Sequence, residues 1–383
     1  MKLIKLRPRL DWLLVFLPLA VVLELIGWDW HGMVFLAACL AIIPLAGWMG
    51  KATEHLAARA GEGIGGLLNA TFGNAAELII ALVALRAGLY DVVKASLTGS
   101  IIGNILLVMG AAFLAGGLKH KTQTFHTGGA RIQATMMTLA TIGLILPAAF
   151  HWLAGPQARA AEADLSLEFV VVLLITYALS LLFGLRTHKH FFAGHSGEGA
   201  TVADGRRSAW PVRKSMLVLG LVTALIAWMS EILVGSVETA AHSFGLNGLF
   251  VGLVIVAIIG NAAEHSTAVV LAAKDRMDLS LGVALGSSIQ IALFVAPILV
   301  VASLFIGPEP MNLVFTPAEV LAIFLAVIIA NEIARDGESN WMEGVQLLAV
   351  YVMLCIVFYF LPETALRWAS LAPGWCAPAC CWV

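Results

Sequence analysis

Gly73-Asn74-Ala75-Ala76-Glu77 is repeated as Gly260-Asn261-Ala262-Ala263-Glu264, 187 residues further along the chain. The similarity continues at this offset, because 13 of the 36 positions in residues 73–108 are identical to their counterparts. Composition alone would give about three or four identities in so apolar a chain. The two segments are therefore copies of one structural unit.

The composition of the chain indicates lipid as its solvent. Of its 383 residues, 60% are hydrophobic and only 12% are charged, whereas about a quarter of the residues in a soluble domain are charged. The net charge of −2 indicates no nucleic-acid partner. The chain is predicted to be an all-α integral membrane protein.

Apolar runs predict about eleven transmembrane helices, because a helix needs about 20 apolar residues to cross the hydrocarbon core. The predicted spans are 11–28, 32–50, 62–86, 94–117, 130–153, 165–186, 213–234, 247–273, 279–306, 315–334 and 340–361.

Lysine and arginine predict the orientation of these spans. With a cytoplasmic N-terminus, 18 of the 22 basic residues fall on the cytoplasmic side, and only Arg86, Lys94, Arg159 and Arg367 fall outside. This bias follows the positive-inside rule. The C-terminus is then predicted to lie outside.

The repeat predicts inverted topology. The two copies begin in the third and eighth spans, and because an odd number of spans separates them, they cross the membrane in opposite directions. The predicted division is listed in chain order. It comprises an extra N-terminal helix (1–31), a first five-helix repeat (32–186), a cytoplasmic linker (187–212), a second five-helix repeat (213–361) and a tail (362–383).

Glu77 and Glu264 are expected well inside the hydrocarbon region. A carboxylate there costs several kcal/mol unless it is paired, protonated or bound to a metal ion. Asn74 and Asn261 each lie three residues before a glutamate and share its helical face. Glycine and asparagine weaken a helix, so a break before each glutamate would free backbone carbonyls for a cation. We interpret the two copies as one cation site.

The span after each motif adds polar side chains. Ser100 and Asn104 share one helical face, and Ser287 and Gln290 share another. All of these candidates offer oxygen, which suits a hard cation such as Ca²⁺, whereas zinc and copper favour histidine or cysteine. Ser100, Asn104 and Ser287 could equally serve as hydrogen-bonding contacts between helices.

Other polar residues have less defined predicted roles. His265 follows Glu264 and is a candidate proton relay, and Glu231 is a candidate vestibule residue that takes part in proton coupling. The histidines at 188, 190 and 195 fit a solvated linker. Three cysteines crowd the tail without a second ligand pair, which favours a loose tail over zinc binding; they are Cys376, Cys380 and Cys381.

The two motifs, together with Leu281-Gly282-Val283-Ala284-Leu285-Gly286-Ser287-Ser288-Ile289-Gln290, resemble the calcium/proton exchangers of the cation/calcium exchanger superfamily. The resemblance covers nearly the whole chain. It implies a calcium/proton antiporter in which Glu77 and Glu264 bind calcium and Gln290, Ser100, Ser287 and both asparagines support them. It also implies that peripheral spans slide against a core. The 187–212 linker departs from relatives that carry an acidic helix there.

Four functions follow as hypotheses, with Ca²⁺ and H⁺ as substrates of the first. They are calcium/proton antiport, exchange that uses sodium or carries manganese, passive cation conduction, and membrane-bound catalysis. Catalysis is disfavoured because the sequence holds neither an HExxH pair nor a serine nucleophile elbow. We expect no cofactor and a bacterial plasma-membrane location. The sequence is compatible with a monomer and with a homo-oligomer.

Overall fold

The computed structural model describes residues 10–27, 31–60, 62–155, 159–188 and 210–362. Most of the predicted linker and the tail with Cys376, Cys380 and Cys381 lie outside these described residues.

The first half of the chain forms η1 (Leu10–Val15), α1 (Phe16–Ile26), α2 (His31–Ala60), α3 (Glu62–Phe72), α4 (Ala75–Arg86), α5 (Tyr90–Ile102), η2 (Gly103–Val108), α6 (Met109–Gly117), α7 (Thr127–Ala154), α8 (Arg159–Leu182) and η4 (Phe183–Thr187). The second half forms α10 (Val212–Phe244), α11 (Gly248–Phe250), η6 (Val251–Val256), α12 (Ala257–Gly260), α13 (Ala262–Ala272), α14 (Met277–Gln290), η7 (Ile291–Val295), α15 (Ala296–Ile306), α16 (Pro317–Asp336) and α17 (Trp341–Phe360).

Eight helices in the described residues are long and apolar enough to span a membrane, and a ninth span is formed if the bent pair 248–260 and 262–272 is counted as one. Two of the predicted spans fall outside this set. The first contains an α-helix of only 11 residues, and the third is divided into α3 and α4. The helical membrane fold is confirmed, while the number eleven stays a prediction.

The helix of the second span is longer than the predicted span 32–50. α2 has 30 residues and continues without interruption to Ala60, with Pro44 inside it. The extra turns are amphipathic, and α3 packs against α2. Tertiary contact therefore extends the helix past the point where its apolar run ends.

Four π-helical stretches lie within the described long spans, and η4 forms the end of one of them. η2 and η7 follow α5 and α14 at matching positions of the two repeats, and η6 precedes the bend in the second repeat. A π-helical turn adds a residue to the helix and frequently marks a functional site. η2 contains the predicted site residue Asn104, and η7 begins directly after Gln290.

A short antiparallel ribbon defines one end of the helix bundle. β1 (Gln123–Thr124) pairs with β2 (Glu338–Ser339), joining the connection after α6 to the connection after α16. We call this the ribbon end. The opposite end carries the connections 87–89 and 307–316.

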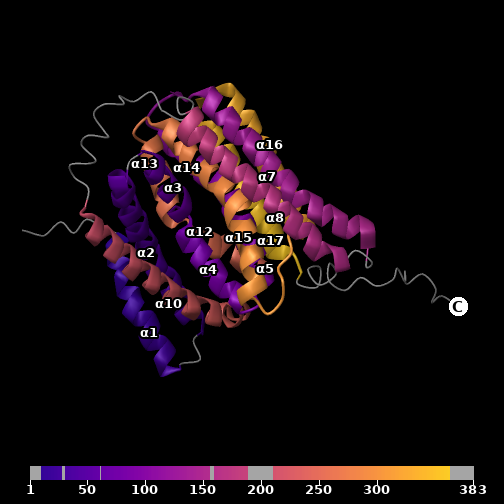
Figure 1. Cartoon of the computed structure of the whole chain (residues 1–383). Coiled ribbons are helices and arrows are strands. Elements are labelled where there is room, and N and C mark those ends of the chain that lie inside the picture. Colours follow the sequence, from indigo (N-terminus) through magenta and orange to yellow (C-terminus); the bar gives the residue numbers. More distant parts are fainter. Residues whose placement is uncertain (1–9, 28–30, 61, 156–158, 189–209, 363–383) are drawn as a thin grey trace, which may run out of the picture.

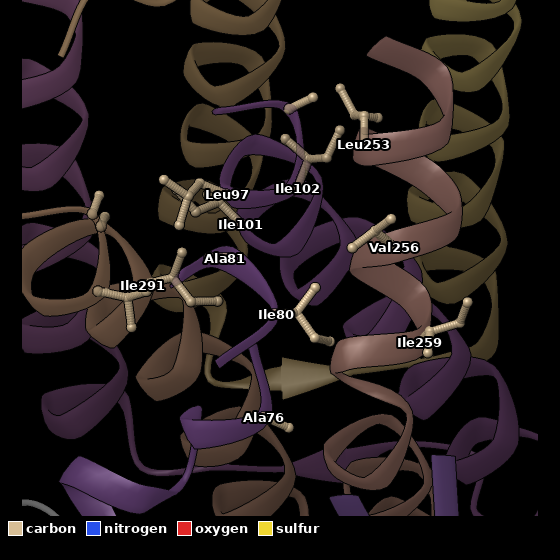
Figure 2. Packing of buried hydrophobic residues seen from close by; sticks show 14 of the residues in the cluster. Ala76, Ile80, Ala81, Leu97, Ile101, Ile102, Leu253, Val256, Ile259 and Ile291 are labelled. Atoms are coloured by element: carbon tan, nitrogen blue, oxygen red, sulfur yellow. The ribbon is translucent and has the colours of Figure 1, made fainter. Parts of the chain in front are cut away.

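The helices form a peripheral group and a core (Figure 1). α1, α2 and α10 pack together, while α3, α4 and α12–α15 lie between this group and the helices α7, α8, α16 and α17. In the core, apolar side chains from α4, α5, η6, α12 and η7 form a continuous contact (Figure 2). It includes Ile80, Ile101, Val256 and Ile291. This seam lies next to both glutamate-bearing helices.

Candidate cation site

Each GNAAE motif forms a break between two helical segments. Asn74 ends the break between α3 and α4 with φ −99° and ψ 24°, and Asn261 lies between α12 and α13 with φ −94° and ψ 0°. The second break bends the span by 60°. Both asparagines take the capping position, but neither side chain caps its helix. Their amides are therefore free to face the centre of the molecule.

The glutamates lie in the first turns of the helices that follow the breaks, α4 and α13. Unpaired backbone N–H groups give a helix N-terminus partial positive charge, which stabilises a carboxylate in that turn. The predicted breaks thus place each glutamate where the backbone itself offsets part of the cost of burying its charge.

The two breaks face each other across the core. A Cβ atom added to Gly260 would lie 2.9 Å from the Cγ atom of Glu77, and one added to Gly73 would lie 3.6 Å from the Oε1 atom of Glu264. Each glutamate therefore packs against the motif glycine of the other repeat. The close approach of Glu77 requires glycine at position 260, and at position 73 the Asn69 carbonyl oxygen, 2.8 Å from an added Cβ, requires it. The arrangement brings the two carboxylates to one place.

The Glu77 carboxylate is held by hydrogen bonds from both repeats. Its Oε1 atom accepts from the Ser100 hydroxyl at 2.5 Å and from the Nδ2 group of Asn261. Asn261 Nδ2 also contacts the Ser100 hydroxyl at 2.9 Å. Glu77, Ser100 and Asn261, all buried, form the first half-site.

The second half-site contains Glu264, Ser287 and Asn74, the equivalents of the first, and adds Gln290 and Asn104 in a different arrangement. The Ser287 hydroxyl donates to Asn74 Oδ1 at 2.9 Å, and Asn74 Nδ2 donates to Gln290 Oε1 at 2.9 Å. Asn104 Nδ2 in turn donates to the Ser287 hydroxyl at 3.1 Å. Asn74 therefore bonds to Gln290, whereas its counterpart Asn261 bonds to a glutamate.

Three oxygen atoms in this cluster are buried acceptors without a hydrogen-bond partner: Glu77 Oε2, Glu264 Oε2 and Asn261 Oδ1. Such atoms are rare in folded proteins, because each loses its hydration without compensation. A bound cation would satisfy all three. The donor set, two carboxylates and an amide with hydroxyls nearby, is the oxygen chemistry of hard cations.

The structure brings together all eight residues that the sequence predicted as ligands. These are Glu77, Glu264, Asn74, Asn261, Ser100, Asn104, Ser287 and Gln290. Within the described residues no group of three histidine, cysteine, aspartate or glutamate side chains could hold a metal ion, so amides and hydroxyls would have to complete the coordination.

The two further proton-coupling candidates fall in different places. His265, adjacent to Glu264, has a buried Nε2 atom with no partner among the described residues. Glu231 lies on α10 and forms an ion pair with Arg86 at 2.8 Å, with both side chains more than half exposed. The structure therefore keeps His265 beside the cluster but gives Glu231 a surface partner at the end of α4.

A second buried polar group escaped the sequence analysis. Lys94 donates to Asn312 Oδ1 at 2.6 Å and to the Val314 carbonyl at 2.8 Å. Glu319 is 1% exposed and accepts from the backbone and side chain of Thr316 in a capping box. The spacing Thr316-x-x-Glu319 could have predicted the helix start. The hydrogen bonds from Lys94 on α5 hold the 307–316 connection against that helix.

Packing around the cluster differs between the two ends of the bundle. At the opposite end, η6 lies against α5 so closely that a Cβ on Gly99 would approach the Leu253 carbonyl oxygen to 1.8 Å. The matching crossing at the ribbon end is packed less tightly in the part of the chain that the structure describes, where the atom nearest to a Cβ on Gly286 would be Gln133 Nε2 at 3.9 Å. Gly73 is exposed, whereas Asn74 beside it is buried.

Known proteins share this architecture. The family model described as sodium/calcium exchanger protein matches residues 30–186 and 214–360. A Ca(2+)/H(+) antiporter of Aphanothece halophytica is 46% identical over 359 residues, covering 91% of this chain and 96% of the relative. The Ca(2+)/H(+) antiporter ChaA of Bacillus subtilis is 43% identical over 345 residues, covering 90% and 96%.

Solved structures agree with these relatives. The structure of native YfkE superposes with a TM-score of 0.79 at 39% identity, covering 92% of this chain and 99% of that one. The H+/Ca2+ exchanger CAX, at 14% identity, shares the fold with a TM-score of 0.68. The chain therefore belongs to the sodium/calcium exchanger family, and within that superfamily it is one of the calcium/proton exchangers.

Proposed function

We propose that this protein is a secondary antiporter that exchanges Ca²⁺ for H⁺ by alternating access. The observation that carries the proposal is the set of buried, unpartnered oxygens of Glu77, Glu264 and Asn261 at the crossing of two opposed helix breaks. The Ca(2+)/H(+) antiporters among the relatives support it. Homologues that transport ions support the expectation that the chain is not an enzyme.

Charge balance explains why two carboxylates suffice. One divalent ion between Glu77 and Glu264 leaves the site neutral, and so do two protons. The empty dianion would be too costly to move through a low-dielectric passage. The protein therefore reorients only when loaded with calcium or with protons, which couples the two fluxes without a separate proton channel.

The remaining residues of the cluster support the carboxylates. Asn261 supplies its unpartnered Oδ1 as a direct ligand, because its Nδ2 is already used. Ser100 orients Glu77 through its hydrogen bond. Asn74, Asn104, Ser287 and Gln290 form one chain of hydrogen bonds, which can rearrange to offer oxygens when Glu264 takes up the ion.

We propose that the ribbon end is cytoplasmic. Lys119, Lys121, Lys274 and Arg276 all lie in connections at that end, as the positive-inside rule requires. The N-terminus is then cytoplasmic, the C-terminus is outside, and the bacterial plasma membrane is the expected location. Chemical labelling of single cysteines introduced at Lys121 and at Glu309 would test the orientation, since only one should react from outside intact cells.

Calcium uptake into sealed inverted vesicles tests the proposal directly. An imposed proton gradient should drive calcium uptake against its gradient, and vesicles with Glu77→Gln should take up none. Calcium uptake driven equally well by a sodium gradient would instead support the sodium-coupled alternative. The same assay with manganese in place of calcium would test whether the protein carries manganese. Calcium movement only down its own gradient would support a passive channel and contradict antiport.

A further inference from the structure

Aromatic and basic side chains gather where α2 and α10 meet at the ribbon end. The Lys51 ammonium lies 5.2 Å from the ring centroid of Trp48, and the Lys214 ammonium lies 4.3 Å from that of Trp210. The two indole rings are 6.1 Å apart, and the His55 ring stacks on Trp210 at 4.4 Å. We call these five residues the Trp–Lys cluster.

The cluster is arranged like a membrane-interface site. Its three rings are half-buried, whereas both lysines are exposed. Indole rings concentrate at the level of lipid headgroups, because one part of the ring is apolar and the other is wet. Lysine side chains there lie along apolar surface and present their ammonium groups to the headgroups.

Both ammonium groups are available for an anion. Among the described residues neither Lys51 nor Lys214 forms an ion pair. Arg213 is exposed next to Lys214. The carboxylates nearby are Asp11, which accepts from Trp48 Nε1 at 3.1 Å, and the exposed Glu54.

The surroundings increase the positive charge. Arg59 lies two turns beyond Lys51 on α2. In the part of the chain that the structure describes, Lys51, Lys214 and Arg213 outnumber the carboxylates of Asp11 and Glu54 at the cluster. This excess of positive charge favours an anionic partner.

An apolar stripe continues from the cluster along α10. Leu217 and Leu221 lie three and seven residues after Lys214, on the same helical face, and are 74% and 62% exposed. A phosphate held by the lysines would thus have exposed apolar surface beside it for an acyl chain.

We propose that the Trp–Lys cluster binds the headgroup of an anionic phospholipid. The phosphate lies between Lys51 and Lys214, and one acyl chain lies along Leu217 and Leu221. The site joins α2 of the first repeat to α10 of the second, the pair that packs outside the ion-binding core. A lipid bound there couples exchange to the charge of the membrane while leaving the ion site unchanged.

Lipid binding to the purified full-length chain tests this proposal. The probe is phosphatidylglycerol titrated into neutral-lipid nanodiscs, and the test variant is Lys51→Gln with Lys214→Gln. Two lysines near an anionic surface predict affinity weaker by about 30-fold. The matched control, Lys119→Gln with Lys121→Gln, removes the same charge from another connection at this end and should bind like the unaltered chain.

Two further arms decide between the possible outcomes. Replacing both lysines by arginine should retain binding and so exclude misfolding as the cause of a loss. Unchanged affinity in the glutamine variant, or an equal loss in the control, would overturn the proposal. Competition by glycerol phosphate as effective as that by the lipid would also overturn it, because the site would then be one for soluble anions.

Discussion

At the ribbon end, α3 of the first repeat packs mainly against α2 of the peripheral group, whereas at the opposite end η6 of the second repeat packs against α5 of the core. Ile64 on α3 is 62% exposed, but its counterpart Val251 on η6 is 1% exposed. Among the described residues the same contrast separates Gly286, whose crossing is loosely packed, from Gly99, whose crossing is tightly packed. Matching positions of the two repeats therefore occupy two different environments.

The contrast extends to the ion-binding residues. Asn261 bonds to Glu77 across the closed crossing, while Asn74 bonds to Gln290 beside the open one. Because the repeats are inverted, exchanging the two arrangements would open the opposite end and close the ribbon end. We infer that the asymmetry of the half-sites records one of the two states of alternating access.

Removing either carboxylate should have the largest effect. Glu77→Gln or Glu264→Gln leaves one charge to neutralise a dehydrated divalent ion, so each should abolish exchange. Calcium uptake by vesicles with matched amounts of protein is the measurement. Near-normal uptake by either variant would remove that glutamate from the site.

Alanine substitutions at Gly99 and Gly286 should affect thermal stability differently, because the first crossing is tightly packed and the second is not. Gly99→Ala places a Cβ against backbone, and overpacking of this kind costs about 1–3 kcal/mol or more, so thermal stability should fall. Gly286→Ala meets no close atom, so stability should hold, yet exchange should slow because closing the ribbon end would bring that Cβ into contact. Equal melting temperatures for the two variants would contradict the assignment of open and closed ends.

Replacing Asn261 should weaken calcium binding more than replacing Asn74. Asn261→Ala removes both a hydrogen bond to a carboxylate and an unpartnered oxygen, and loss of about 1.5–3 kcal/mol weakens calcium binding by roughly 10- to 100-fold. Asn74→Ala should cost less, since Asn74 bonds to a neutral amide. Isothermal titration with calcium measures both. A larger loss at Asn74 would reverse the proposed roles of the half-sites.

The smallest effect is expected at Gln290. Gln290→Ala removes one hydrogen bond between neutral groups, worth about 1 kcal/mol, so calcium should bind less tightly by only several-fold. The same titration measures it, with Gln133→Ala as a control outside the cluster. Binding as tight as in the unaltered chain would make Gln290 a structural contact and not a supporting ligand.

Much of this site could be predicted from the sequence, because burying a charge in a membrane is costly and carboxylates inside apolar spans therefore indicate a binding site. The paired motifs predicted both glutamates, both helix breaks and the eight polar residues that the structure gathers. The asymmetry could be predicted only in part. Asn104 and Gln290 have no polar counterpart, because Ile291 and Gly103 stand at the matching positions of the other repeat. The packing of α3 against α2 and of η6 against α5 adds a difference that the sequence does not show.

Other features were missed for local reasons. The second predicted span was ended at residue 50 because its apolar run ends there, whereas the polar residues that follow belong to the same helix as far as Ala60. The ribbon of two-residue strands and the π-helical stretches have no pattern long enough to recognise. Lys94 and Glu319 were not predicted to form a polar group, since their environment depends on how the connection 307–316 folds back over α5.

The central claim is that calcium and protons compete for the same two carboxylates, and calcium binding at several pH values tests it most directly. A metal ligand must be deprotonated, so protons displace calcium from Glu77 and Glu264 as the pH falls. The affinity of the purified protein for calcium should therefore decrease steadily from about pH 8 to about pH 5. An affinity that stays constant across this range would contradict the shared site and move the proton to another group, with His265 the first to examine.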